Sequence, residues 1–177
     1  MAPKIDRREF LKLAGIGGVV FASGIGCSVA RNGVSAATSD NEDFYFVQLS
    51  DTHWGFVGPE ANPDPTGTLP KAVAAVNSLS VQPDFIVFTG DLTHTTEDPR
   101  DRRRRVGEFK EIRSKLKVQS IRFMPGEHDG SLDKSKAFQE FFGPTYYTFD
   151  YRNVHFIVLD NVSDPRARLG EAQLQWL

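Results

Sequence analysis

Four short runs of apolar, β-branched or aromatic residues set the limits on the fold of this chain. They cover residues 44–49, 85–89, 120–124 and 154–159. The second and fourth runs are almost continuously apolar, which is typical of strands covered on both faces. Between the runs lie segments whose apolar residues recur at helical spacing. This alternation of strand and helix predicts an α/β sheet with crossover connections.

The expected helices follow from these stripes of apolar residues. One runs from Leu69 to Val76, with Pro70 expected in its first turn. A second covers residues 106–116, and a shorter one covers 138–142. A last helix begins after Gly170.

Three other segments have distinct expected structures. Residues 55–70 hold four Pro and three Gly, so they are expected to form a loop, and loops of this length often carry function. Residues 146–149 are expected to pair with 154–159 as a hairpin. The four arginines 102–105 are interpreted as the solvated start of a helix, with contact to an anionic partner as the alternative.

Residues 1–37 are predicted to be a signal peptide, separate from the folded body. A basic segment with Arg7 and Arg8 precedes an uncharged stretch, 13–30, that contains five glycines. The arginine pair and the residues after it resemble a twin-arginine export signal. The export machinery is therefore an expected partner, and the expected location is exported, periplasmic or extracytoplasmic. A partial lipidation motif at Cys27 makes a lipid anchor the alternative.

Composition narrows the classes of function. The chain has 21 Lys and Arg against 23 Asp and Glu, so no nucleic-acid-binding surface is expected. A single Cys excludes a disulfide framework and a thiolate zinc cluster, which leaves carboxylate and imidazole groups as metal ligands. The uncharged N-terminal stretch is too short and too rich in Gly to predict a membrane span, and none is expected in the mature chain.

Polar side chains follow three of the expected strands. Asp51 and His53 come after the first, Asp91 follows Gly90 after the second, and residues 127–129 (Glu-His-Asp) come after the third. In extended backbone, residues two apart point to the same side, so a carboxylate and an imidazole at that spacing can hold one cation. Ligands of α/β sheets bind beyond the carboxyl ends of the strands. The sequence therefore predicts a site at that edge.

This ordered set resembles the calcineurin-like metallophosphoesterase family, whose signature runs Asp-x-His, Gly-Asp and Gly-Asn-His-Asp/Glu. The resemblance spans about Phe44 to Leu177 within a predicted domain at residues 41–177, and it implies an αββα sandwich, incomplete at the C-terminus. It also implies a phosphoric ester hydrolase that acts on a phosphoester substrate. Two divalent or mixed-valence metal ions (Mn, Fe or Zn) that activate water are the implied cofactors.

The resemblance also implies a role for each matching residue. The implied metal ligands all follow strands: Asp51 and His53 for the first metal, Asp91 as the bridge, and Glu127 for the second metal. His128 is implied to stabilise the developing charge or to protonate the leaving oxygen. Asp129 is implied to hold the ring of His128.

Two features depart from the family pattern. Glu127 replaces the family's Asn, so it is expected to hold the second cation more tightly and to weaken the attraction for phosphate; a solvent-facing turn residue is the alternative. The family's later isolated His and its Gly-His-x-His motif are missing, and His155 is expected to be a packed strand residue. The chain is therefore expected to be an N-terminal part, incomplete at the C-terminus. The alternative function is a non-catalytic exported metal-binding or interaction module with the same fold.

Three residues near the motifs are left outside the implied ligand set. His94 is expected to be a surface loop residue rather than one that faces the substrate. For Trp54 and Phe56, lining a substrate entrance and packing under the loop both stay open.

Overall fold

The computed structural model describes the backbone of Val19–Ser23 and, with side chains, residues 43–177. Within these residues a four-stranded sheet has the order β1-β2-β3-β4. Strands β2 (Tyr45–Leu49), β3 (Phe85–Phe88) and β4 (Ile121–Phe123) are parallel, and β1 (Val19–Ser23) is antiparallel to β2. The predicted α/β sheet is therefore confirmed. Strand β1 falls within the expected signal peptide, and the rest of that segment lies outside the described residues.

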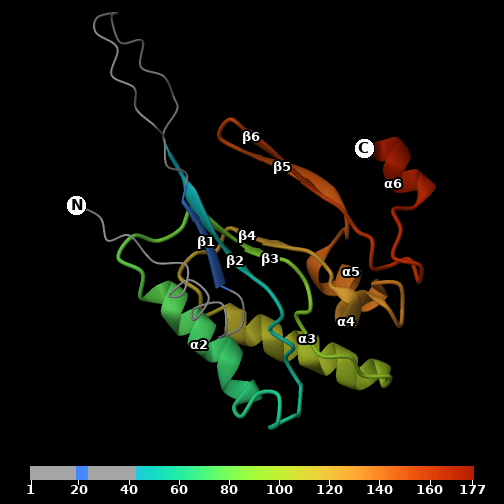
Figure 1. The fold of residues 1–177 in the computed structure, drawn as a ribbon, viewed down its shortest axis with the longest axis horizontal. Coiled ribbons are helices and arrows are strands. Elements are labelled where there is room, and N and C mark those ends of the chain that lie inside the picture. The colour runs from blue at the N-terminus through green and yellow to red at the C-terminus, as the bar shows by residue number, and fades with distance from the viewer. Residues whose placement is uncertain (1–18, 24–42) are drawn as a thin grey trace, which may run out of the picture.

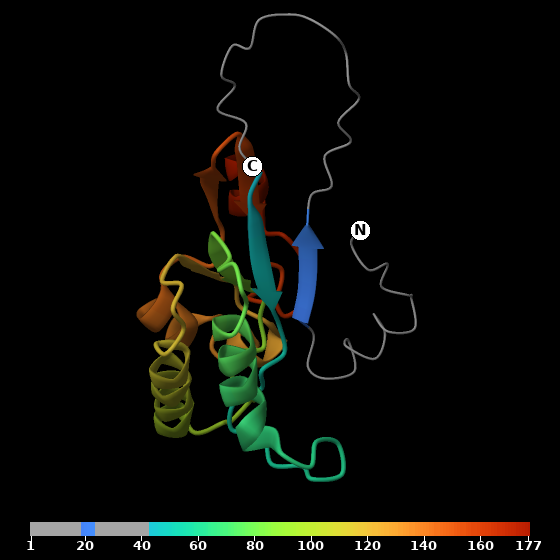
Figure 2. The ribbon, with the colours of Figure 1, turned by 90° about the vertical axis from the view of Figure 1, so that its left-hand side faces the viewer.

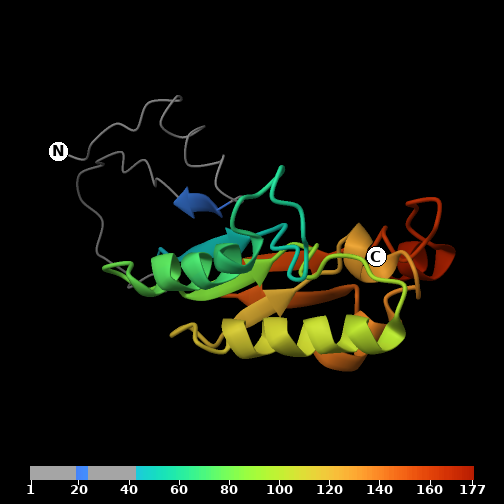
Figure 3. The same ribbon diagram turned by 90° about the horizontal axis from the view of Figure 1, so that it is seen from below.

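Two helices cover one face of the sheet. The crossovers contain α2 (Pro65–Asn77) and α3 (Pro99–Arg113), which lie side by side in Figure 2 and in front of the sheet in Figure 3. Apolar side chains of the strands and helices meet there in one buried cluster, whose members include Val47, Leu49, Leu69, Val73, Val76, Ile86, Phe88 and Phe109. Burial of this cluster fixes the sheet against the helices.

A hairpin covers the opposite face of the sheet. Strands β5 (Tyr147–Tyr151) and β6 (Val154–Val158) pair antiparallel, as the sequence predicts. Their rings meet the sheet edge-on, since Phe149 and Phe156 lie 5.7 and 5.5 Å from Phe85 between ring centroids. Figure 1 shows the resulting order of layers, from the hairpin through the sheet to α2 and α3. These layers agree with the sandwich that the sequence resemblance implies.

Helix α2 begins one turn earlier than the sequence analysis expects. Asp64 is its N-cap, and its carboxylate accepts a hydrogen bond from Gly67 N at 3.0 Å, with Pro65 in the first turn. Pro70 therefore lies inside the helix, and the expectation for it is wrong. The loop accordingly ends at Asp64 rather than Pro70. An Asp-Pro pair is a helix start signal, because proline needs no N–H partner there.

Three short helices complete the described part of the chain: α4 (Glu127–Gly130), α5 (Lys136–Phe142) and α6 (Glu171–Trp176). Helix α5 packs on α3, where the ring of Phe142 lies 6.0 Å from that of Phe109. None of the helices in the described ranges is long and apolar enough to cross a membrane.

The arginines 102–105 of α3 divide into two pairs. The middle two are exposed, as expected. Arg102 is buried, and its Nη1 donates to Asp133 Oδ2 at 2.8 Å. Arg105 is half-buried, and its Nη1 donates to the carbonyl oxygen of His94 at 3.0 Å. A fully solvated run is therefore the wrong expectation, because one face of the helix supports the loops beside the sheet.

Candidate metal centre

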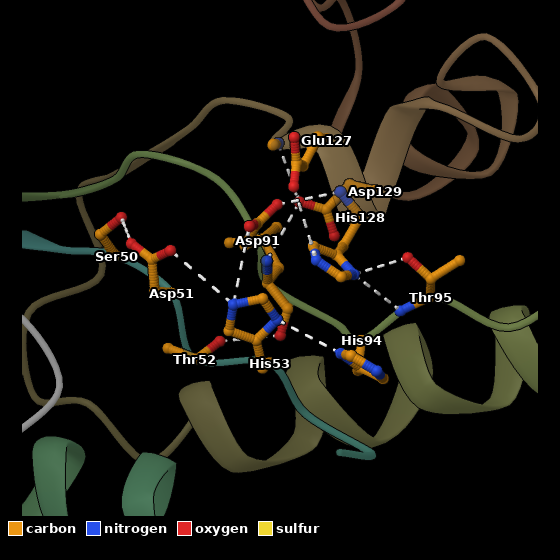
Figure 4. Close-up of polar contacts among 12 residues, drawn as sticks. Ser50, Asp51, Thr52, His53, Asp91, His94, Thr95, Glu127, His128 and Asp129 are labelled. Atoms are coloured by element: carbon orange, nitrogen blue, oxygen red, sulfur yellow. Dashed lines mark hydrogen bonds and ion pairs between the residues drawn. The ribbon is translucent and has the colours of Figure 1, made fainter. Parts of the chain in front are cut away.

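The loops after β2 and β3 run side by side at the carboxyl edge of the sheet (Figure 4). Backbone N–H groups of Asp51 and His53 donate to the carbonyl oxygens of Gly90 and Asp91 at 3.1 and 2.9 Å. The buried hydroxyl of Thr52 donates to Leu92 O at 2.7 Å. These bonds extend the parallel pairing beyond the strands, so they set the positions of the side chains between them.

The backbone at three of the predicted ligands is left-handed. The φ angles of Asp51, His53 and Asp91 are 57, 42 and 49°. The extended geometry from which the sequence analysis paired Asp51 with His53 is therefore wrong, although the two side chains do face each other. Left-handed backbone costs a non-glycine residue about 1–2 kcal/mol, and such residues often mark functional sites.

Two glycines let the loops after β3 and β4 approach each other. Gly90 has a φ of 107°, and a Cβ atom there would lie 2.7 Å from backbone atoms of Gly126. A Cβ atom on Gly126 would lie 2.1 Å from Asp91 Oδ1. Any side chain at either position would separate the two loops, so the glycines of both motifs are required by packing.

The first metal-capable group combines Asp51, His53 and Asp91. Nε2 of His53 lies 3.7 Å from Asp51 Oδ1 and 3.6 Å from Asp91 Oδ2. The side chain of Asp91 is 15% exposed and that of Asp51 is 60% exposed. When bonds from a metal ion to its ligands are about 2.0–2.2 Å long, as for Zn, the ligand atoms lie about 3 Å or a little more from one another. The group therefore fits a metal ion after a small contraction.

The second group combines Asp91, Glu127 and His128. Glu127 is exposed, yet its Oε1 lies 3.8 Å from His128 Nε2 and faces this group (Figure 4). The N–H of His128 donates to Asp91 Oδ1 at 3.0 Å, which holds the start of α4 against the loop after β3. Asp91 is the one residue that these two groups share.

Thr95 holds the ring of His128. Its backbone N–H donates to Nδ1 at 3.3 Å, and its Oγ1 lies 2.6 Å from the same atom. Nδ1 is therefore an acceptor, and a neutral His128 carries its proton on Nε2. That tautomer suits a proton donor better than a metal ligand. No feature of the sequence analysis singled out Thr95, because its contact with His128 spans 33 positions.

Asp129 does not hold the His128 ring, so that expectation is wrong. Its buried carboxylate accepts from the backbone N–H groups of Leu92, Thr93 and Gly126 at 3.0–3.1 Å. Burial raises the pKa of Asp129 to about 6, against the lowering effect of those three hydrogen bonds. Asp129 instead ties the loop after β3 to the loop after β4.

His94 turns toward the site rather than toward solvent. Its Nδ1 lies 3.5 Å from His53 Nδ1, and its ring stacks on that of His128 with centroids 4.8 Å apart. Burial, followed by the charges of His128, His53 and Arg105, lowers the pKa of His94 and favours its neutral form. The three imidazoles form a further metal-capable group. The expectation of a surface loop residue at His94 is therefore wrong, and its position three residues after Asp91, beyond a strand, was the available signal.

The remaining aromatic and imidazole residues divide between packing and the site. The indole N–H of Trp54 donates to Glu108 Oε2 at 2.8 Å, so Trp54 packs the loop on α3. Phe56 lines a cavity beside the site. His155 is exposed and pairs with Asp150 at 2.5 Å on the hairpin, so it is not the packed residue expected.

The layered sheet, with carboxylates and imidazoles gathered at its carboxyl edge, defines a domain of the metallophosphoesterase type. The profile of the calcineurin-like phosphoesterase family matches residues 44–168. The chain belongs to this family.

Curated relatives share this part of the sequence. Over 153 residues the chain is 28% identical to the serine/threonine-protein phosphatase CPPED1 of Mus musculus, covering 76% of the chain and 49% of that protein. Over 99 residues it is 29% identical to the probable glycerophosphodiester phosphodiesterase GpdQ of Arcobacter nitrofigilis, covering 54% of the chain and 33% of that protein. The chain thus spans about half the length of the first relative, and less of the second.

Proposed function

We propose that the full-length protein hydrolyses phosphoesters with the help of a pair of metal ions. The observation that carries this proposal is the position of Asp91, which belongs to two metal-capable groups at once. A carboxylate shared between two sites is what a pair of cations about 3.5–4 Å apart requires. Family membership supports the same reaction class.

The residues of the candidate site have two kinds of proposed role, metal binding and proton donation. Asp51 and His53 would hold the first ion, Asp91 would serve both ions, and Glu127 would hold the second. Bound Mn, Fe or Zn ions would supply charge neutralisation at phosphate oxygens and a water of lowered pKa. His128, with its proton on Nε2, donates a hydrogen bond to the phosphate or a proton to the leaving oxygen. Asp129 is a positioning residue, because it acts by holding two loops together.

The test is hydrolysis of 4-nitrophenyl phosphate and bis(4-nitrophenyl) phosphate by the full-length protein supplied with Mn, Fe or Zn. Both ester classes are included because one relative is named as a phosphatase and another as a diesterase. Asp91→Asn should abolish turnover, while Asp150→Asn on the exposed hairpin should retain it. Turnover that survives Asp91→Asn would refute the bridging role. Metal binding without any turnover would favour the non-catalytic module instead.

We also propose export through the twin-arginine pathway, which rests on the sequence of residues 1–37. Arg7→Lys combined with Arg8→Lys should leave the protein in the cytoplasmic fraction with its N-terminus intact. Mass spectrometry of the exported form should show cleavage near Ala37. A lipid-modified Cys27 at the new N-terminus would instead support the anchored alternative.

A further inference from the structure

The geometry points to a class of substrate for the proposed hydrolase: a phosphoester whose organic group is uncharged, largely apolar and at least the size of an aromatic ring. This inference rests on the proposed function. It comes from a cavity of about 560 Å³ that adjoins the side chains of Asp51 and His53. Ligand pockets in proteins span about 300–1,000 Å³, so this cavity has the size of a small-molecule site.

The six residues of segment 56–68 that line the cavity form one of its walls. Its lining side chains are mostly apolar: Phe56, Ala61, Pro63 and Pro65. The two polar ones, Asn62 and Thr68, are bonded to each other, with Nδ2 of Asn62 donating to Oγ1 of Thr68 at 2.9 Å. Asn62 Oδ1 also accepts from Asp64 N at 3.0 Å. The wall therefore offers apolar contact rather than free hydrogen-bonding groups.

The charge around the cavity argues against a second anionic group on the substrate. None of the described residues that line it is Lys or Arg. Arg105 packs against Gly55, but its guanidinium donates to the carbonyl oxygen of His94 and pairs with Asp101 at 2.8 Å. A nucleoside di- or triphosphate would place further negative charge beside Asp51 without a cationic partner.

The wall is held in place by local contacts. Ala61 N and Asn62 N both donate to Gly58 O, at 3.1 and 3.0 Å. The ring of Phe56 meets the ring of His94 edge-on, with centroids 5.0 Å apart. Because these contacts already order the wall, little conformational entropy is lost when a ring binds against it.

The test compares the binding of benzylphosphonate and methylphosphonate to the Mn-loaded full-length protein by calorimetry. Neither compound has a P–O–C bond to hydrolyse, so the comparison does not depend on turnover. Burial of a phenyl group should make benzylphosphonate bind roughly tenfold tighter or more, at about 25 cal/mol per Å² of apolar surface. Ala61→Phe, which places a ring in the part of the cavity beside segment 56–68, should reduce the ratio of the two affinities towards one. Val57→Ala is the matched control, because Val57 is 87% exposed and outside the lining.

Each other outcome overturns the inference. Equal affinities in the native protein, or a ratio that Ala61→Phe leaves unchanged, would show that the cavity does not bind the organic group. Tighter binding of the charged phosphonoacetate than of benzylphosphonate would show that a second anion is preferred. If neither phosphonate binds the Mn-loaded protein, recognition of phosphate itself fails, and the proposed function fails with it. Hydrolysis of the nitrophenyl esters without a benzyl preference would refute this inference alone.

Discussion

The two metal-capable groups that contain carboxylates share Asp91 but are positioned differently. In the first group, the backbone of Asp51 and His53 is hydrogen-bonded to the loop after β3. In the second, Glu127 begins a four-residue helix, and its side chain is 78% exposed. The first group is therefore fixed by the sheet, whereas the second depends on a long side chain that must be ordered when it binds, at a cost in conformational entropy.

This difference coincides with the departure from the signature described in the sequence. The candidate ligands fixed by backbone pairing, Asp51, His53 and Asp91, are those that match it. The departure falls on Glu127, which is exposed and whose side chain can be exchanged without disturbing the packing around it. We therefore expect the first group to set the position of the site, and the residue at 127 to set the charge of its second group.

The largest effect should come from removing the carboxylate that joins the loop after β3 to the loop after β4. Asp129→Ala leaves the N–H groups of Leu92, Thr93 and Gly126 without their acceptor, so unfolding should become easier by roughly 3 kcal/mol or more. Thermal and urea unfolding measure this. Glu127→Ala, two positions away and exposed, should change stability by no more than about 0.5 kcal/mol. Equal effects of the two changes would mean that Asp129 does not join the loops.

Removing one ligand from each group tests the difference between them directly. His53→Ala should weaken metal binding more than about 100-fold. Mutation of residues that only hydrogen-bond to metal ligands already lowers metal affinity about 10–100-fold, and loss of a ligand itself should lower it further. Glu127→Ala should weaken only the second ion, by about tenfold, since its side chain is less fixed. Metal analysis after dialysis, combined with manganese titration, gives both values, and His155→Ala on the hairpin serves as the control. Similar losses of metal affinity in His53→Ala and Glu127→Ala would show that the two groups are equally fixed.

A smaller effect, on turnover, is expected from changing Thr95, which contacts the ring of His128. Thr95→Val removes the hydroxyl beside His128 Nδ1 but keeps the backbone N–H donor. The turnover rate, kcat, should fall roughly tenfold with little change in KM. Nitrogen NMR of the imidazole should show a smaller share of the tautomer with its proton on Nε2. A fall in kcat with an unchanged tautomer would mean that Thr95 acts only through packing.

The smallest effect should come from Asp84, which directly precedes β3 and so lies at the opposite end of that strand from Asp91. Burial disfavours its charge, but hydrogen bonds from Tyr151 Oη at 2.6 Å and Tyr45 N at 3.1 Å, together with the charge of Arg152, lower the pKa of Asp84 below 3.8. Its charged form is thus favoured in the folded state, so Asp84 stabilises the fold above its ordinary pKa, and this stabilisation disappears as pH falls through the lowered value.

Asp84→Asn should therefore cost about 1 kcal/mol at neutral pH. The difference from the native protein should shrink as pH falls below about 4. Urea unfolding measured between pH 3 and pH 7 checks this, and metal affinity at neutral pH should stay unchanged. A stability difference that grows on acidification would contradict the lowered pKa.

Much of the fold was predictable because its evidence is local. The apolar runs that became β2, β3 and the hairpin have strand-like sequences, and the stripe that includes Phe109 has helical spacing. The predicted ligands follow the strands directly, and strands that are parallel bring their ends to one edge. Burial of apolar surface selects these elements, so the sequence pattern carries the prediction. The start of α2 was missed only because Asp64-Pro65 was assigned to the loop.

The order of the elements and the identity of the residues at their ends follow from local patterns in the sequence. How those residues are used depends on tertiary packing: the left-handed backbone at Asp51, the inward turn of His94, the burial of Arg102, and the role of Asp129 as a link between loops. The hydrogen bonds of Asp129 to Leu92 and Thr93 span 36 or 37 positions. Contacts of that range depend on how closely two loops approach, which is set by packing around Gly90 and Gly126 and not by any local pattern.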